Sequence, residues 1–507
     1  MIFNYNIKCK YLHFGGIYLK TINDIKLNYS ERPIKVLQFG EGNFLRAFVD
    51  YMIDIANEKG VFDGNVAIVK PIPFGNIESF KAQNCKYTVV LRGQQDGRTV
   101  DESRIITSVS AVYDAAESYN EWMALASSVS LRFVVSNTTE AGIAFDPEDH
   151  YDGLPESYPG KLTKFLYERY KAFNGASDSG LIILPVELIE NNGGKLRECV
   201  LKLCECWSLP SGFCDWVKSA CVFCSTLVDR IVTGFPRESA DAICARLGYT
   251  DKLLDVGEPF ALWVIESEKD ISRELPLDKA GLPVIFTDNQ KPYRERKVRI
   301  LNGAHTSSVL AGYLCGLDIV RDCMHDPDIG RLIRRTVNNE IAPFVPLPRE
   351  ETLSFASSVF ERFENPFIDH KLLSISLNSV SKWKARVLPS FKDCFAENRE
   401  LPPLLTFSFA ALLAFYRSDR LTNGGLTAQR PGGEEYTVHD SEEVLECFAR
   451  AASKSDLEYT KAIASNTGLW GEDLTAYPKF AETAANWLNA ICSAPREAVK
   501  KILEETE

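Results

Sequence analysis

The chain has 507 residues, 45% hydrophobic and 25% charged, which is the composition of an ordinary globular protein. Its formal net charge of −12 argues against nucleic acid or an anionic membrane as the main partner. No run approaches the roughly 18 apolar residues of a membrane span and no signal peptide is evident, so we expect a cytoplasmic protein whose fourteen cysteines are reduced.

This length allows two or three domains. Strand and helix patterns alternate through the first part of the chain, which predicts an α/β domain of the Rossmann type with a mainly parallel sheet. From about residue 291 helical periodicity dominates. We therefore expect a lead-in arm over residues 1–32, a dinucleotide-binding domain over 33–290, and a mostly α-helical substrate and catalytic domain over 291–507.

The first strong strand is predicted over Ile34–Phe39, and it runs directly into a turn with glycines at Gly40 and Gly42. An amphipathic helix is predicted over 44–57. Strand, glycine turn and helix together are typical of a dinucleotide-binding unit, because the glycines let the backbone approach a pyrophosphate at the helix N-terminus. Leu45 stands where the fingerprint has its third glycine, so a turn without a cofactor is the alternative.

Two later strand ends bear on ligand binding. The second strand, Val66–Lys70, ends in a lysine where NAD enzymes usually carry an acid for the ribose 2′-hydroxyl, and a basic residue there favours a 2′-phosphate. The choice between NAD and NADP therefore stays open. Strand 131–136 ends in the polar stretch 137–140, at the kind of position where open α/β sheets bind ligands, although a plain polar loop would look the same.

Further elements are predicted from the same patterns. Strands are expected over 87–92, 103–109, 181–185 and 284–286, and helices over 117–127, 161–173 and 195–207. In the second domain, helices are expected over 304–317, 329–341, 349–362, 403–416 and 442–453, with a surface loop over 423–433.

A lysine, an asparagine and a histidine open the helical domain at Lys297, Asn302 and His305. A lysine normally has a pKa of about 10.4, and nearby positive charge with partial burial lowers it, so that it can take a proton from an alcohol. Asn302 and His305 would share one helix face and could hold the alcohol oxygen. A solvated basic face is the alternative. The positive charge would come from Arg294, Arg296 and Arg299.

In their order along the chain, these pieces resemble the mannitol dehydrogenase family of polyol-specific long-chain dehydrogenases. The resemblance runs from about residue 33 to the C-terminus. It rests on Gly40-x-Gly42-x-Phe44-x-Arg46-Ala47, Thr139-Glu140, Asp229-Arg230-Ile231, Glu258-Pro259-Phe260 and Lys297-x4-Asn302-x2-His305. It implies an NAD-dependent secondary-alcohol dehydrogenase that uses no metal.

Within the family the resemblance is strongest to members that interconvert D-altronate and D-tagaturonate in hexuronate catabolism. It implies that Lys297 is the general base of oxidation and the general acid of reduction, and that Asn302 and His305 bind the reacting oxygen. Fructuronate, mannitol and arabinitol are the alternative substrates, and a sensor without catalysis would lack the lysine. The implied cofactor contacts are Phe39, Gly40, Glu41, Gly42, Asn43, Phe44, Arg46, Asn137, Thr138, Thr139 and Glu140.

One position departs from the family pattern. Mannitol-type members carry an asparagine after a Cys-Asp pair, and Leu188 stands there in this chain, after Val186 and Glu187. Asn302 would then carry more of the oxyanion contact. A small anionic sugar acid also needs an anchor for its carboxylate, for which guanidinium and ammonium groups are suited. The candidates in the helical domain are Arg362, Asn365, His370, Lys371, Lys382 and Arg386, with a solvated basic face as the alternative.

Overall fold

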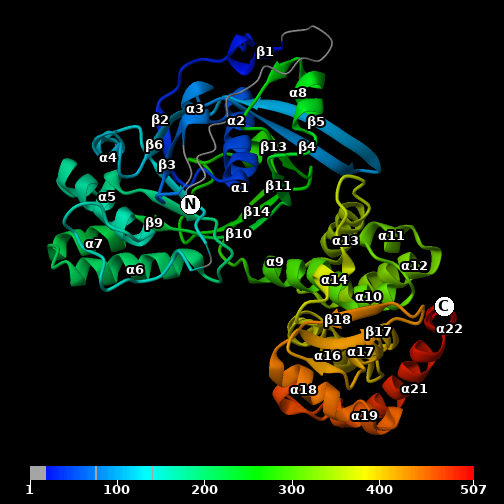
Figure 1. Ribbon diagram of the computed structural model, residues 1–507. Coiled ribbons are helices and arrows are strands. Elements are labelled where there is room, and N and C mark those ends of the chain that lie inside the picture. Colours follow the sequence, from blue (N-terminus) through cyan, green and yellow to red (C-terminus); the bar gives the residue numbers. More distant parts are fainter. Residues whose placement is uncertain (1–18, 75–76, 140) are drawn as a thin grey trace, which may run out of the picture. The chain divides into compact units, whose positions relative to one another are not determined.

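The computed structural model describes residues 19–74, 77–139 and 141–507, and two compact units make up this part of the chain (Figure 1). The first unit contains the residues up to Arg92 together with Asp101–Gln290, and the second contains Gly93–Val100 and Lys291–Glu507. Over these residues no helix is both long and apolar enough to cross a membrane. Most of the predicted lead-in arm, residues 1–18, lies outside the described residues, and the short strand β1 (Lys20–Thr21) pairs with β12 (Tyr249–Thr250).

A six-stranded sheet forms the centre of the first unit, and every adjacent pair of strands in it is parallel. In spatial order its strands are β6 (Val109–Asp114), β3 (Asn65–Lys70), β2 (Ile34–Phe39), β7 (Phe133–Ser136), β8 (Ile182–Pro185) and β9 (Val222–Phe223). This is the order of a Rossmann sheet, whose direction of winding reverses between β2 and β7. The predicted α/β fold with a parallel sheet is confirmed.

Alternate residues of each strand pack into two separate hydrophobic cores, one on each face of the sheet. The strands are therefore continuous apolar runs in the sequence. In β2, Val36 packs into a core with Phe48 and Met52, while Leu37 and Phe39 pack into a core on the other face. The helices of the first unit are α1 (Asn43–Leu45), α2 (Tyr51–Glu58), α3 (Glu78–Ala82), α4 (Tyr119–Met123), α5 (Tyr158–Ala172), α6 (Asn192–Cys206), α7 (Ser211–Ser219) and α8 (Ala240–Leu247).

The predicted strand 103–109 is wrong in part, because it spans two strands: β5 (Arg98–Ile106) ends before β6 begins at Val109. Thr107 and Ser108 separate them. The Thr107 N–H and hydroxyl bind the Asp54 carboxylate at 2.7 and 2.8 Å, and the Ser108 hydroxyl binds the Asp50 carbonyl at 2.8 Å. These bonds tie Thr107 and Ser108 to the helix that follows the Gly40–Gly42 turn, and they interrupt the strand.

Two smaller sheets complete the first unit. One has the order β10 (Ser225–Asp229), β14 (Leu262–Glu266) and β15 (Val284–Thr287). The other has the order β11 (Val232–Gly234), β13 (Asp255–Gly257), β4 (Tyr87–Gln95) and β5.

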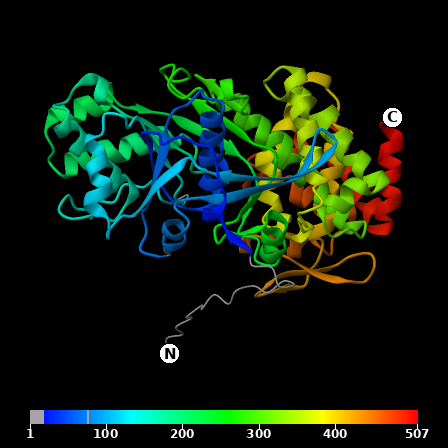
Figure 2. The same ribbon diagram turned by 90° about the horizontal axis from the view of Figure 1, so that it is seen from above.

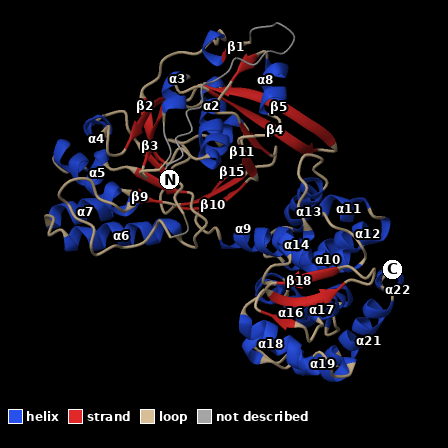
Figure 3. Ribbon diagram, viewed as in Figure 1, coloured by secondary structure: helices blue, strands red, loops and turns tan. Residues whose placement is uncertain are grey.

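The second unit is mainly helical (Figure 3). Its first helix begins at Lys291, well before the predicted start at Ala304, and runs without interruption through α9 (Lys291–Arg296), a π-helical turn (Lys297–Asn302) and α10 (Gly303–Leu314). The other helices are α11 (Val320–His325), α12 (Pro327–Arg335), α13 (Arg349–Phe363), α14 (Leu372–Ile375), α15 (Ser379–Arg386), α16 (Leu388–Asn398), α17 (Pro403–Tyr416), α18 (Glu442–Ala451), α19 (Asp456–Ala464), α20 (Thr467–Trp470), α21 (Phe480–Ser493) and α22 (Pro495–Glu505).

Helix α17 is the buried centre of this unit, and its predicted bounds are confirmed. The Glu340 carboxylate caps its N-terminus by accepting the Leu404 and Leu405 N–H groups at 2.9 and 2.7 Å. Such a cap satisfies donors that a helix end leaves unpaired.

The predicted surface loop 423–433 is wrong in part, because β16 (Leu421–Thr422), β17 (Gly425–Gln429) and β18 (Glu435–Val438) form an antiparallel sheet there. Figure 2 shows these strands in orange at one edge of the unit. Leu426 and Val438 are buried opposite each other. The glycines and polar residues between the strands hid this alternation in the sequence.

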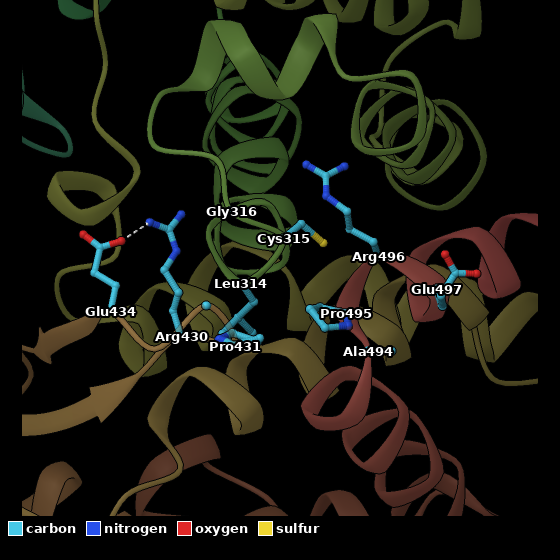
Figure 4. Close-up of a pocket in the computed structure, with 11 residues that line it drawn as sticks. Leu314, Cys315, Gly316, Arg430, Pro431, Glu434, Ala494, Pro495, Arg496 and Glu497 are labelled. Carbon is cyan, nitrogen blue, oxygen red and sulfur yellow. Dashed lines mark hydrogen bonds and ion pairs between the residues drawn. The ribbon is translucent and has the colours of Figure 1, made fainter.

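The C-terminal end of α10 is held by Arg430, which is 93% buried as a side chain. Its guanidinium donates to the Tyr313 and Leu317 carbonyls at 3.1 and 3.0 Å and pairs with Glu434 at 2.8 Å. Figure 4 shows this pair on the wall of a cavity of about 510 Å³ between the end of α10, the turn after β17 and the start of α22. A cation on orphan carbonyls stabilises a helix C-terminus, so Arg430 fixes the far end of the helix that carries His305.

Candidate active site

The turn after β2 requires glycine at Gly40. Its φ is +123°, and a Cβ there would lie 3.2 Å from both the Asn137 carbonyl oxygen and Leu45 Cδ1. The Gly40 N–H donates to the Val69 carbonyl at 3.0 Å, and the Asn137 N–H donates to the Phe39 carbonyl at 3.2 Å. Only glycine adopts this conformation without strain, so the turn is pressed against the loop after β7 at the point where the sheet reverses its winding.

Gly42 precedes the first helical residue, Asn43, and has open space beside it. Among the described residues no heavy atom lies within 4 Å of the place where its Cβ would be. The helix that follows continues to Glu58 through a π-helical turn at Arg46–Asp50. Free N–H groups, a positive dipole end and open space are what a pyrophosphate needs, so the residues present fit a dinucleotide.

Arg46 lies inside the fold beneath this turn. Its guanidinium donates to the Leu253 carbonyl at 2.6 Å and to the Asn43 side chain, and lies 3.8 Å from Asp255. The Arg46 Cζ atom lies 5.2 Å from the centroid of the Tyr87 ring. Arg46, one of the predicted cofactor contacts, therefore braces the glycine turn from within, and Asn43 is drawn toward it.

A second arginine holds the widened π-turn of this helix. Arg230 donates to the Ala47 carbonyl at 2.6 Å and to the carbonyls of Pro259 and Phe260 at 3.1 Å each, and it lies over the Tyr51 ring. Burial lowers the pKa of Arg230 to about 10. The Asp-Arg-Ile and Glu-Pro-Phe pieces of the sequence are thus neighbours that support the glycine-turn helix.

Glu187 organises the loop after β7. Its carboxylate accepts the Thr138 N–H and hydroxyl at 2.9 and 3.0 Å and the Ser136 hydroxyl at 3.2 Å. The Asn137 side chain donates to the Val186 carbonyl at 3.2 Å. The predicted cofactor residue Glu140 lies outside the described residues. Leu188, at the position that departs from the family pattern, is 65% exposed and contributes no polar group.

The π-helical turn changes how Lys297, Asn302 and His305 face one another. A regular α-helix advances about 100° per residue, so eight residues would place Lys297 and His305 about 80° apart around the axis. A π-turn takes up one extra residue, and here the Gly303 N–H binds the Val298 carbonyl, five residues back. The extra residue reduces the angle between Lys297 and His305 to about 20°, and the angle between Lys297 and Asn302 to about 40°. The three side chains therefore share one side of the helix.

Two of the arginines expected to surround Lys297 are engaged elsewhere. Arg296 is buried against the Phe355 ring at 4.6 Å and pairs with Glu351 at 3.4 Å. Arg299 is buried and pairs with Asp393 at 2.7 Å. Carboxylates therefore balance both positive charges, and both arginines join the helix to its neighbours.

His305 lies between an aromatic ring and a second histidine. Its imidazole stacks on Phe363 at 4.1 Å between ring centroids and meets His370 edge-on at 5.3 Å. Its Nε2 atom is buried and has no hydrogen-bond partner within the described part of the chain. Burial holds the pKa of His305 well below its ordinary value, and neighbouring positive groups lower the pKa further. His305 is thus a neutral imidazole with an unused hydrogen-bonding nitrogen.

Four of the six predicted substrate residues act on this imidazole: His370 contacts it edge-on, and His370, Arg362, Arg386 and Lys382 all lower its pKa through their charges. Lys382 and Arg386 are one turn apart on α15, and burial lowers the pKa of both. The Arg386 guanidinium donates to the Thr306 hydroxyl at 3.4 Å, and the Lys382 ammonium donates to the Ile375 carbonyl at 2.9 Å. Cationic side chains near the unpaired Nε2 atom of His305 suit an anionic substrate that carries hydroxyl groups.

The other two predicted substrate residues lie differently. Asn365 is buried, and its side-chain oxygen accepts the Phe367 N–H at 2.9 Å, so it shapes the turn after α13. Lys371 is exposed and forms a backbone bridge with Ile319. Sequence reasoning missed Phe363, since no spacing rule distinguishes a ring under a histidine from a core phenylalanine.

Comparisons with known proteins agree with this architecture. The family model described as "Mannitol dehydrogenase Rossmann domain" matches residues 34–279, and "Mannitol dehydrogenase C-terminal domain" matches residues 289–492. An altronate oxidoreductase of Yersinia enterocolitica is 43% identical over 95% of this chain and 99% of its own length. One of Escherichia coli O7:K1 is 43% identical over 96% of this chain and 100% of its own length.

Two solved structures share the fold at 20% identity. D-sorbitol dehydrogenase in substrate-free form has a TM-score of 0.74 and covers 93% of this chain and 95% of its own. The Pseudomonas fluorescens mannitol 2-dehydrogenase, solved as a ternary complex with NAD and D-mannitol, has a TM-score of 0.61 and covers 96% of both chains.

The two glycines of the turn should respond differently to the same substitution. Gly40→Ala forces a Cβ against Asn137 and a strained φ, so we expect a lower melting temperature along with weak dinucleotide binding. Gly42→Ala meets no protein atom, so we expect an unchanged melting temperature but at least tenfold weaker binding of NADH, measured by fluorescence titration. Equal NADH affinity in Gly42→Ala and the unmodified protein would show that the phosphates bind elsewhere.

Proposed function

We infer the function of this enzyme from its family and its site: the chain belongs to the mannitol dehydrogenase family. We propose that it is an NAD-dependent oxidoreductase that interconverts D-altronate and D-tagaturonate. The relatives that cover nearly the whole chain at 43% identity are altronate oxidoreductases, which supports this substrate pair.

The observation that carries the proposal is the unpartnered Nε2 of His305 inside a group of cationic side chains. A buried polar atom without a partner costs about 1–3 kcal/mol, and a substrate oxygen would remove that cost. The cations on α15 and at the end of α13 would receive a carboxylate. A neutral polyol such as mannitol has no use for them, whereas a sugar acid has.

The glycine turn Gly40–Gly42 and the N-terminus of the helix that follows would hold the pyrophosphate, and the loop after β7, built around Glu187, would lie toward the nicotinamide. When bound, NAD supplies the hydride acceptor of the oxidation and NADH the donor of the reduction.

In altronate oxidation, Lys297 would remove the proton of the reacting hydroxyl as the hydride leaves the carbon that bears it, and a carbonyl forms. Asn302 and the neutral His305 would hold the oxygen throughout. In the reverse direction the protonated Lys297 returns the proton. Phe363 fixes the plane of the His305 ring by stacking, so that Nε2 is already oriented before the substrate arrives.

Fructuronate reduction is the second candidate, because fructuronate carries the same carboxylate and differs only in stereochemistry. The cationic group around His305 favours both acids over a neutral keto-sugar.

Removal of the base tests the chemistry. We expect strong oxidation of NADH in the presence of tagaturonate, weaker oxidation with fructuronate, and little with fructose. In Lys297→Ala we expect a loss of kcat of about 10²- to 10⁴-fold, the usual worth of a positioned acid or base, while NADH binding is retained. Lys392→Ala, which removes an exposed lysine paired with Glu472, is the control and should leave kcat unchanged. Turnover in Lys297→Ala at the rate of this control would remove the lysine from the mechanism.

Substrate charge tests the anchor. We expect Arg386→Ala and Lys382→Ala to raise KM for tagaturonate about 10- to 100-fold, since a charge-assisted hydrogen bond is worth about 1.5–3 kcal/mol. Activity with fructose, measured at high concentration, should change by less than threefold. Lys384→Ala on the same helix serves as the matched control, because residue 384 lies on a different side of α15 from 382 and 386. Equal losses with the acid and with the neutral sugar would contradict a carboxylate anchor.

A further inference from the structure

We propose that Asp114 at the end of β6, together with Glu41 in the glycine turn, sets a preference for NAD over NADP, and that Lys70 serves these carboxylates rather than a 2′-phosphate. The inference rests on the proposed function in one respect, namely that a dinucleotide binds at this turn. It resolves the conflict between Lys70 and the usual acidic residue at the end of the second strand.

Lys70 is in the place where a Rossmann fold recognises the adenosine ribose. It follows Val69, whose carbonyl accepts the Gly40 N–H, so the end of β3 adjoins the glycine turn. The Lys70 side chain is only 3% exposed, and its ammonium lies 2.8 Å from the Asp114 carboxylate. It also donates to the Ile72 carbonyl at 2.9 Å and to the Phe74 carbonyl at 3.4 Å. Lys70 thus joins β3, β6 and the loop after β3.

Asp114 is placed to stay charged. Burial alone would raise the pKa of Asp114, but the Lys70 ammonium and the N–H groups of Ala116 and Glu117 bring the pKa below its ordinary value. Its side chain remains 16% exposed at the carboxyl end of the sheet. A carboxylate here can accept a ribose hydroxyl, which is the role usually taken by an acid on the preceding strand.

Glu41 adds a second carboxyl group to the same region. It lies in the glycine turn, where burial raises its pKa while the nearby Lys70 and Arg46 lower it, and it also interacts electrostatically with Asp114. Lys70 is paired with Asp114, and Arg46 beneath the turn faces Asp255 at 3.8 Å. With Glu41 ionised, Lys70, Asp114 and Glu41 therefore sum to one negative charge. A phosphate monoester carries about −1.5 to −2 charges at neutral pH. The 2′-phosphate of NADP would therefore meet net repulsion, and it would have to break the Lys70 pair to find a cation.

The test compares equilibrium binding of NADH and NADPH by fluorescence titration, with no substrate present. We expect the unmodified protein to bind NADH at least tenfold more tightly. In Asp114→Asn the Lys70 ammonium loses its carboxylate, so we expect the ratio of the two dissociation constants to shift at least tenfold toward NADPH. The double variant Asp114→Asn, Lys70→Met should lose that gain, because the released cation is gone.

Glu117→Gln is the matched control, since it removes an exposed negative charge three residues further along and should leave the ratio unchanged. If Asp114→Asn does not fold, Glu41→Gln tests the same charge sum from the turn and should shift the ratio in the same direction. A ratio in Asp114→Asn equal to that of Glu117→Gln, or equal binding of both dinucleotides by the unmodified protein, would overturn the inference. Preferential NADH binding without turnover of tagaturonate would overturn the proposed substrate alone, and failure to bind either dinucleotide would overturn both.

Discussion

The extra residue in the helical turn at Lys297–Asn302 is the constraint on which the proposed chemistry depends. Without it, the lysine and the histidine of this helix would face directions about 80° apart. With it, the proposed proton-transfer group Lys297 and the two proposed oxygen-binding groups, Asn302 and His305, share one side of a rigid helix. Neighbouring elements hold that helix at several points, through Arg296, Arg299 and, at its far end, Arg430. Rigid elements position reacting groups more precisely than loops do.

The same device occurs in the first unit, where the helix after the glycine turn widens at Arg46–Asp50. There too a buried arginine, Arg230, donates to a carbonyl of the widened turn. Burying Arg46, Asp50 and Asp255 together is costly, and burial raises the pKa of both acids to about 7. π-turns are frequent at functional sites, and in the first unit these buried polar groups lie beneath the turn and hold its geometry.

Periodicity and turn chemistry predicted most of the architecture, because strands such as Ile34–Phe39 and helices such as Pro403–Tyr416 have sharp ends in the sequence. They missed the start at Lys291 of the helix that carries Lys297 and His305, since a π-turn disrupts the 3.6-residue pattern on which helix prediction depends. The strand break at Thr107 and Ser108 depends on bonds to helical residues 53 and 58 positions earlier in the chain. Distant partners also explain why Arg296 and Arg299 were expected to supply positive charge to Lys297. The carboxylates that pair with them lie 55 and 94 residues away in the chain.

The division of labour between Lys297 and His305 is best tested by the pH dependence of kcat/KM for altronate oxidation, measured in the unmodified enzyme and in His305→Asn. Burial and neighbouring cations keep His305 neutral, so the mechanism predicts that activity rises with pH as one other group loses its proton. His305→Asn should then lower kcat/KM without moving the apparent pKa of that rise. A rise near the ordinary histidine pKa of about 6.5 that disappears in His305→Asn would show that the histidine, and not the lysine, transfers the proton.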